Sequence, residues 1–246
     1  MIEQLRQTIA RMERPPGLED AGLQPFGIGE LDAVLGGGLA RGALHEIAAV
    51  SEAHVPAASG FVLGLARHER SIVWIAEDMA NIESGVPLGC GLDEFGLPPE
   101  RLLMVSVSQR RDLLWAMEEA LHCAAVGAVI GELRHESLDA VALRRLSLAA
   151  AANDAFAFLM RSSPTQESST AATRWIAGAA PSQPRYGPGA PCINAQLVRN
   201  RRGMPGAWLL EWNERNECFV LASAHPQPLA TPPADRQAGA FARSVA

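Results

Sequence analysis

The stretch FGIGELDAVLGGGLARGALHEI, residues 26–47, decides the fold that the sequence predicts. Within it, GELDAVL at residues 29–35 predicts a short helix. Three glycines follow at residues 36–38, and glycine suits the left-handed conformation that ends many helices. ALHEIAAV, residues 43–50, then predicts a buried strand. A turn and a short helix therefore lead into the first strand of the predicted core.

From this strand to residue 163, apolar strands alternate with helices. Further strands are expected at residues 71–77, 102–108, 125–133 and 155–163, and helices at residues 57–68, 110–124 and 138–153. Residues 78–100, which are interrupted by Gly and Pro, are expected to be irregular. Strands that alternate with helices predict an α/β fold, with a mostly parallel sheet covered by helices on both faces.

The pattern changes after residue 163, where short segments alternate apolar and polar residues and are joined by tight turns. Strands are expected at residues 173–180, 193–201, 206–213 and 217–223, as an antiparallel meander that extends one edge of the sheet. The predicted organisation is an amphipathic helix at residues 1–17, one core domain at residues 18–224 and a flexible tail at residues 225–246.

The composition excludes several chemistries. All 21 basic residues of the 246-residue chain are arginine, so no lysine can form a Schiff base or complete a G-x-x-x-x-G-K-[ST] phosphate loop. The four cysteines lack metal-ligand spacing, and no G-x-S-x-G or H-E-x-x-H motif occurs. We therefore expect no metal, no cofactor and no catalytic centre. No secretory signal or membrane-spanning run is apparent, and a cytoplasmic location is expected.

Charge is unevenly distributed along this acidic chain, whose net charge is −6. Residues 1–139 hold 10 arginines and 21 acidic residues, whereas residues 140–246 hold 11 arginines and six acidic residues. Either a solvated surface or a basic partner-binding face in the second half would produce this asymmetry.

Three stretches together resemble the RecA superfamily and, within it, the ImuA family of damage-inducible mutagenesis accessory proteins, which is related to SulA-type inhibitors. GIGELDAVLGGGLARGALHEI is similar to the segment that opens the RecA core. AVGAVIGEL, residues 125–133, stands where that superfamily carries its Walker B strand. LVRNRRGMPGAWLLEW, residues 197–212, is similar to a late pair of RecA strands. The resemblance covers roughly residues 22–223 and implies a RecA-like core.

The sequence departs from the RecA pattern where the phosphate loop belongs, directly after the first strand. SEAHVPAASGFVLG occupies residues 51–64, and Ser59 and Gly60 stand about where G-K-[ST]-[ST] would be. No lysine can reach a phosphate there, and no hydroxyl follows to hold Mg²⁺. Glu132 takes the Walker B position, but a structural role is favoured over metal binding. We expect the ATPase architecture without ATP hydrolysis.

Arg199, Arg201 and Arg202 form the second candidate site. The resemblance implies a partner contact, because the matching basic residues of RecA filaments reach across a subunit interface. On a continuous strand, Arg199 and Arg201 would share one face and Arg202 would point the other way. A charged edge that prevents aggregation is the alternative, and both interpretations stay open. Trp208 and Trp212 nearby are expected in the core.

The resemblance implies a non-catalytic accessory protein of error-prone translesion DNA synthesis in the SOS response. Its expected partners are an ImuB-type Y-family polymerase homologue, the RecA filament and an error-prone replicative-type polymerase. One alternative is a SulA-like inhibitor of cell division, although SulA-type chains are shorter. The other is a RecA paralogue that binds DNA weakly through residues 140–210, which hold eight arginines and two acidic residues.

Overall fold

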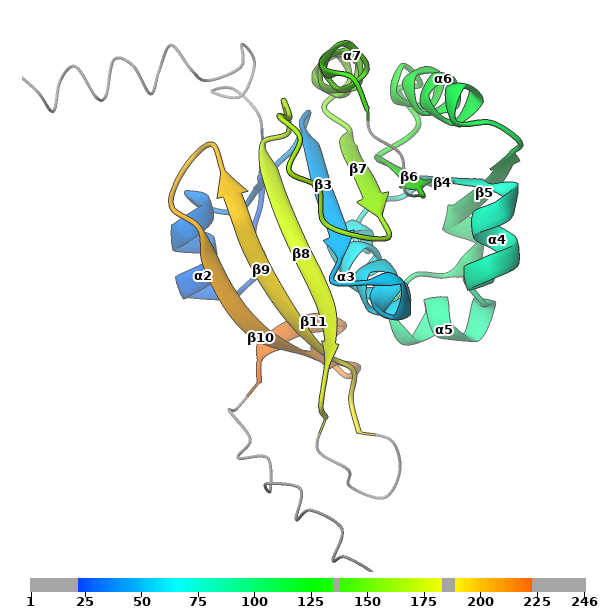
Figure 1. Ribbon diagram of the computed structural model, residues 1–246. Coiled ribbons are helices and arrows are strands. Elements are labelled where there is room, and N and C mark those ends of the chain that lie inside the picture. The colour runs from blue at the N-terminus through cyan, green and yellow to red at the C-terminus, as the bar shows by residue number, and fades with distance from the viewer. Residues whose placement is uncertain (1–21, 135–137, 183–188, 223–246) are drawn as a thin grey trace, which may run out of the picture.

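The computed structural model describes residues 22–134, 138–182 and 189–222 (Figure 1). The helix predicted at residues 1–17 and the tail predicted at residues 225–246 lie outside these residues. Among the described helices, none is long and apolar enough to cross a membrane.

A nine-stranded sheet forms the centre of the molecule, with strand order β11-β10-β9-β8-β3-β7-β6-β4-β5. The strands are β3 (Leu44–Ala49), β4 (Ile72–Glu77), β5 (Leu102–Val107), β6 (Ala128–Leu133), β7 (Phe156–Arg161), β8 (Thr173–Ala180), β9 (Cys192–Asn200), β10 (Gly206–Asn213) and β11 (Cys218–Leu221). The six strands from β5 to β8 are parallel, and β9, β10 and β11 continue the sheet in antiparallel pairs. The mostly parallel sheet with an added meander is therefore confirmed.

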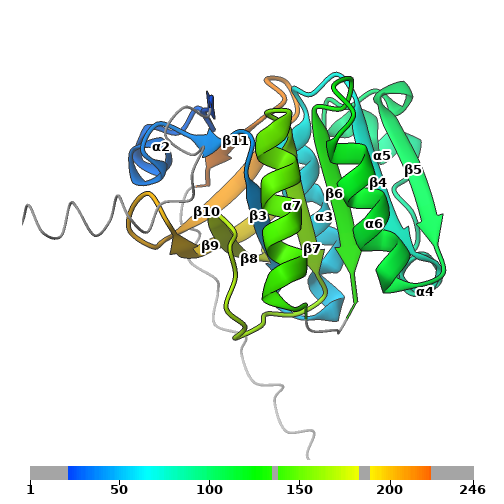
Figure 2. The same ribbon diagram turned by 90° about the horizontal axis from the view of Figure 1, so that it is seen from above.

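Helices cover both faces of this sheet, as the alternating pattern predicted. Helix α3 (Val55–Ala66) packs on one face, while α6 (Arg110–Leu121) and α7 (Ala140–Ala152) lie side by side on the other (Figure 2). The short helix α2 (Gly29–Leu35) lies beside the antiparallel strands and ends at Gly36, whose φ of 73° requires the left-handed conformation. The predicted glycine C-cap is thus present.

The structure corrects the sequence prediction in three places. Strand β8 was expected in the antiparallel meander, but it pairs in parallel with β3, so the meander turns antiparallel only at β9. Residues 78–100, expected to be irregular, contain α4 (Asp78–Ser84) and α5 (Gly89–Glu94). Two-residue strands β1 (Leu23–Gln24) and β2 (Leu39–Ala40) pair outside the main sheet. Helices α4 and α5 and strands β1 and β2 are too short for hydrophobic periodicity to reveal them.

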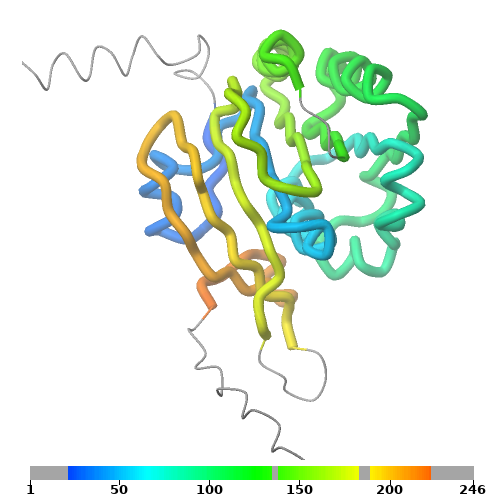
Figure 3. Tube along the Cα trace, in the orientation of Figure 1, coloured from blue at the N-terminus to red at the C-terminus, as the bar shows by residue number. Residues whose placement is uncertain are grey.

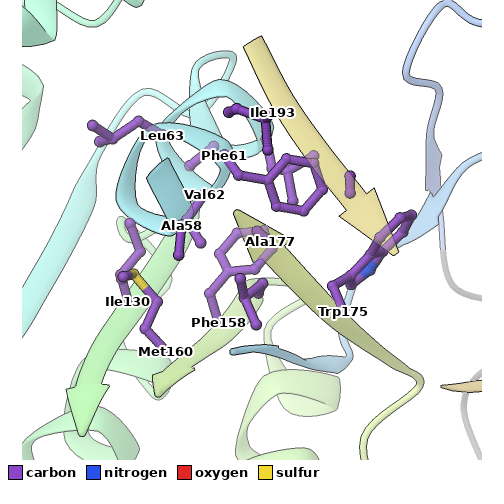
Figure 4. Close-up of a cluster of buried hydrophobic side chains, with 14 of the residues drawn as sticks. Ala58, Phe61, Val62, Leu63, Ile130, Phe158, Met160, Trp175, Ala177 and Ile193 are labelled. Atoms are coloured by element: carbon purple, nitrogen blue, oxygen red, sulfur yellow. The ribbon is translucent and has the colours of Figure 1, made fainter. Parts of the chain in front are cut away.

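The larger hydrophobic core lies between α3 and the sheet. Phe61 of α3 is fully buried, and its ring centroid lies 5.4 Å from that of Trp175 on β8 (Figure 4). Phe158 and Met160 of β7 belong to the same core layer. The tube trace shows how the chain returns past α3, so the helix is enclosed by both early and late strands (Figure 3). Trp208 and Trp212 join the same core, as predicted.

Gly64 allows β10 and β11 to pack against α3. A Cβ atom at this position would lie 2.6 Å from Cζ of Phe219 on β11 and 3.1 Å from the ring of Trp212 on β10. Real Cβ atoms essentially never approach so closely, so the missing side chain sets the distance between helix and strands. Strands β10 and β11 therefore pack directly against α3.

His45 on β3 is fully buried and neutral. Its Nε2 atom lies 2.8 Å from the carbonyl oxygen of Ala40, which can only accept, so Nε2 carries the proton. Nδ1 then accepts from the hydroxyl of Thr173, whose oxygen accepts in turn from the indole of Trp175. Burial lowers the pKa of His45 to about 4. The imidazole thus has a structural role, because it joins β3 to β8 through Thr173.

We predict that Gly64→Ala destabilises the protein by about 1–3 kcal/mol, because the added methyl group overpacks the contact with Phe219. The measurement is urea-induced unfolding followed by circular dichroism. Gly91→Ala is the matched control, since nothing lies within 4 Å of a Cβ there and alanine favours the helix. Equal unfolding midpoints for Gly64→Ala and wild type would contradict this packing role.

We predict that His45 makes the protein sensitive to acid between pH 6.5 and 4. The unfolded chain takes up a proton near pH 6.5, whereas the folded chain does so only near pH 4. Stability therefore falls as the pH falls through this window, by at most about 3 kcal/mol. The free energy of unfolding should drop less steeply in His45→Gln, which cannot titrate. Parallel pH profiles for the two proteins would count against this assignment.

Candidate functional site

The structure brings Ser59, Gly60 and Glu132 together in one pocket of about 280 Å³. The pocket lies between α3 and the segment that carries α4 and α5, and Trp74 of β4 and Phe95 contribute to its wall. Glu132 comes from the carboxyl-terminal end of β6, next to β4. The three residues that the sequence singled out as the degenerate nucleotide region are thus neighbours in space.

The start of α3 differs from the loop expected there. After β3 the chain makes one 3₁₀ turn, Glu52–His54, and α3 begins at Val55 rather than at residue 57. Pro56 stands in the first turn and has no N–H to offer a phosphate. Ser59 and Gly60 therefore lie inside the helix, one turn beyond the position where a phosphate-binding loop would deliver its lysine and hydroxyl.

Ser59 bonds within this helix, whereas Gly60 has a packing role. The Ser59 hydroxyl donates to the carbonyl oxygen of Val55 at 3.0 Å, the usual bond of a serine to the preceding turn. Gly60 admits the ring of Phe95, because a Cβ at this position would lie 2.8 Å from Cζ of that ring. Both residues thus shape the wall between α3 and α5.

Glu132 is the polar group of the pocket, and its side chain is only 8% exposed. The indole of Trp74 donates to Oε2 at 3.3 Å. Oε1 is buried without a hydrogen-bond partner, and the guanidinium of Arg134 lies 4.0 Å away from it. Burial raises the pKa of Glu132, although Arg134 and Trp74 oppose this shift. No cluster of three metal-ligating side chains occurs among the residues that the structure describes.

Arg201 and Arg202 lie beyond the end of β9, so the predicted alternation of faces does not extend to them. The Arg201 guanidinium donates to the carbonyl oxygen of Ser169 at 3.0 Å, and its backbone N–H donates to Ala172. The backbone N–H of Arg202 is bonded to the side chain of Asn200. Because Arg201 lies past the end of the strand, a face shared by Arg199 and Arg201 stays a prediction.

Arg199 stays within β9, where it lies opposite Arg174 of β8 next to an irregularity in the register. Arg174 in turn forms an ion pair with the buried Glu46 at 2.6 Å. Because Asn200 is paired with Thr173 at the start of β8, the three candidate arginines lie at the amino-terminal ends of the parallel strands. The pocket with Glu132 lies toward the opposite ends, so the two predicted sites are separate.

Sequence reasoning did not find the pocket as an apolar cavity. Trp74 was expected only as part of a strand, and Phe95 lies in the segment expected to be irregular. Leu92 and Phe95, three residues apart, are both pocket residues, and this helical spacing was the available indication. With only six residues, α5 is too short for this spacing to predict a helix.

Comparison with known proteins defines the class of the chain and then its relatives. The fold is RecA-like: the RadB recombinase superposes with a TM-score of 0.53, at 16% identity, over 79% of this chain and 97% of the recombinase. No family model matches the sequence. Protein ImuA from two strains of Caulobacter vibrioides is 29% identical over 236 residues, which cover 87% of this chain and 91% of ImuA. The chain is thus similar to ImuA over most of its length, as its motifs predicted.

We predict that Gly60→Ala destabilises the protein by about 1–3 kcal/mol, because the new methyl group displaces Phe95 from α3. Ser59→Ala should change stability by no more than about 0.5 kcal/mol, since the serine bonds only within its own helix. Thermal unfolding of both variants checks the pair. A larger loss of stability in Ser59→Ala than in Gly60→Ala would contradict the packing of Phe95 against Gly60.

Proposed function

We propose that this chain is a non-catalytic accessory protein of error-prone translesion DNA synthesis, acting in the SOS response. In this role it docks an ImuB-type homologue of the Y-family polymerases. The RecA filament and an error-prone replicative-type polymerase are the other proposed contacts. The single observation that carries the proposal is homology to ImuA over most of the chain, on a fold whose phosphate-binding residues are replaced.

The chemistry around α3 supports the non-catalytic part of the proposal. A phosphate-binding helix start needs free backbone N–H groups and, in this fold, a lysine and a hydroxyl for Mg²⁺. Here Pro56 removes one N–H group, Glu52 adds a negative charge in the preceding turn, and lysine is absent from the whole chain. Glu132 faces apolar side chains across the pocket. ATP would meet a carboxylate and apolar walls where it needs positive charge.

The surfaces of the described residues support docking. Five large apolar side chains are exposed on α4, on the loop that follows it and on the edge strand β5, which contacts α4; they are those of Met79, Ile82, Val86, Leu88 and Met104. Exposed apolar side chains that lie close together mark interaction sites in soluble proteins. At the opposite ends of the sheet, the Arg201 guanidinium donates a hydrogen bond to the carbonyl oxygen of Ser169. This bond restricts the conformation of Arg201 at the surface where a partner would bind.

We predict that the purified chain forms a complex with the ImuB-type protein of its own organism and hydrolyses ATP no faster than background. Co-purification and size-exclusion chromatography measure the first, and phosphate release measures the second. Glu132→Gln should leave the background rate unchanged. An ATPase rate well above background that falls in Glu132→Gln, or no complex with the full-length chain, would overturn the proposed function.

A further inference from the structure

The pocket beside α3 has apolar walls and one acidic group. Helix α3 contributes Val55, Pro56 and Leu63, and the opposite wall comes from Leu92 and Phe95. Polar groups also come from Ser59, Ser84 and the indole of Trp74, which points its N–H at Glu132. A ligand that fills this pocket must be largely apolar, because its walls offer few hydrogen bonds.

The carboxylate of Glu132 is incompletely satisfied. Oε2 accepts one bond from Trp74, but Oε1 is buried and has no hydrogen-bond partner. The guanidinium of Arg134 is too far for a hydrogen bond at 4.0 Å, and it is engaged elsewhere. It forms an ion pair with Glu83 at 3.2 Å and donates to Ser84 and to the carbonyl of Ala80. A buried carboxylate oxygen in this state is stabilised by any N–H donor that enters the pocket.

The surface around the pocket indicates what kind of molecule brings that donor. Val86 and Leu88 belong to the pocket and are 60% and 71% exposed, and Ile82 on the neighbouring α4 is 75% exposed. A small molecule inside the pocket would leave these side chains in water, whereas a protein segment would cover them. Residues 77–100 also carry six acidic side chains and no arginine. The surroundings therefore favour a positively charged, apolar segment.

We propose that this pocket binds an arginine or lysine side chain of a partner protein, presented between apolar residues. The charged end reaches Oε1 of Glu132, the apolar stem lies against the apolar lining formed by Val55, Leu63 and Leu92, and the flanking apolar residues cover Val86 and Leu88. A guanidinium or ammonium group supplies the N–H donors that the carboxylate lacks. An anion is disfavoured by the same carboxylate. This inference deepens the proposed docking role and rests on it for the source of the segment.

The test uses the full-length chain and the synthetic peptide acetyl-Ala-Leu-Phe-Arg-Leu-Ala-amide. Isothermal titration calorimetry measures affinity, and the indole N–H resonance of Trp74 reports occupation of the pocket. We expect saturable binding that shifts this resonance. The same peptide with glutamine in place of arginine should bind about tenfold more weakly, as the loss of a charge-assisted hydrogen bond predicts. Absent binding, or equal affinities for the two peptides, would overturn the proposal.

Variants of the chain locate the effect. Glu132→Gln should abolish the preference for the arginine peptide, while Glu119→Gln on the exposed side of α6 should keep it. Leu88→Ser removes an exposed apolar side chain from the rim without adding charge and should weaken both peptides without altering the fold, so it remains informative if Glu132→Gln unfolds. Retention of full peptide affinity in Leu88→Ser would show that the rim is not part of the site.

The alternative occupant that the test must exclude is the chain's own C-terminal segment, because an aromatic residue and a basic residue, Phe241 and Arg243, stand two positions apart in its sequence. Tighter peptide binding in Arg243→Gln would assign the pocket to this segment and overturn the assignment to a partner. The proposed function fails separately. A complex with the ImuB-type protein that is unaffected by Leu88→Ser and Glu132→Gln would leave the docking role standing and remove only this site.

Discussion

Close packing around α3 is the constraint on which the rest of the structure depends. The helix follows the first core strand and is enclosed by β7 and β8 beneath, by Phe95 on one side and by β10 and β11 on another. Gly60 and Gly64, one turn apart, make the two closest of these approaches possible. Because interiors are packed as densely as organic crystals, a methyl group at either position would have no room. The same helix thus joins early and late parts of the chain and forms one wall of the pocket.

The two ends of the parallel sheet have different chemistry. Toward the carboxyl-terminal ends, Glu132 lies in an apolar pocket with an acidic surrounding segment. At the amino-terminal ends lie Arg199, Arg201 and Arg202, and Glu46 is buried between Arg174 and the hydroxyl of Ser169. An ion pair that loses one partner leaves a buried charge, so Arg174 belongs to the framework rather than to a free surface. The exposed apolar residues of α4 and the loop after it lie at the acidic end, which is where a basic segment would be attracted.

The lack of phosphate-binding residues affects the packing of the β3–α3 connection as well as its chemistry. A phosphate loop holds several backbone N–H groups open for its ligand. Here a short 3₁₀ turn and Pro56 form the connection between β3 and α3, and mostly apolar side chains line the pocket beside the helix. The ligand-binding loop is replaced by packing, and Glu132 remains as the polar group at the end of β6.

The sequence by itself determined the alternation of strands and helices, the glycine end of α2, the core positions of Trp208 and Trp212, and the missing phosphate loop. Each of these depends on local spacing or on one residue type. The absence of lysine, for example, holds for any fold that the chain adopts. The tertiary structure alone decided that β8 is parallel to β3, that Gly60 meets Phe95, and that Arg201 bonds to Ser169. These contacts join residues 32 or more positions apart, and the distance between them depends on how the sheet brings its strands together.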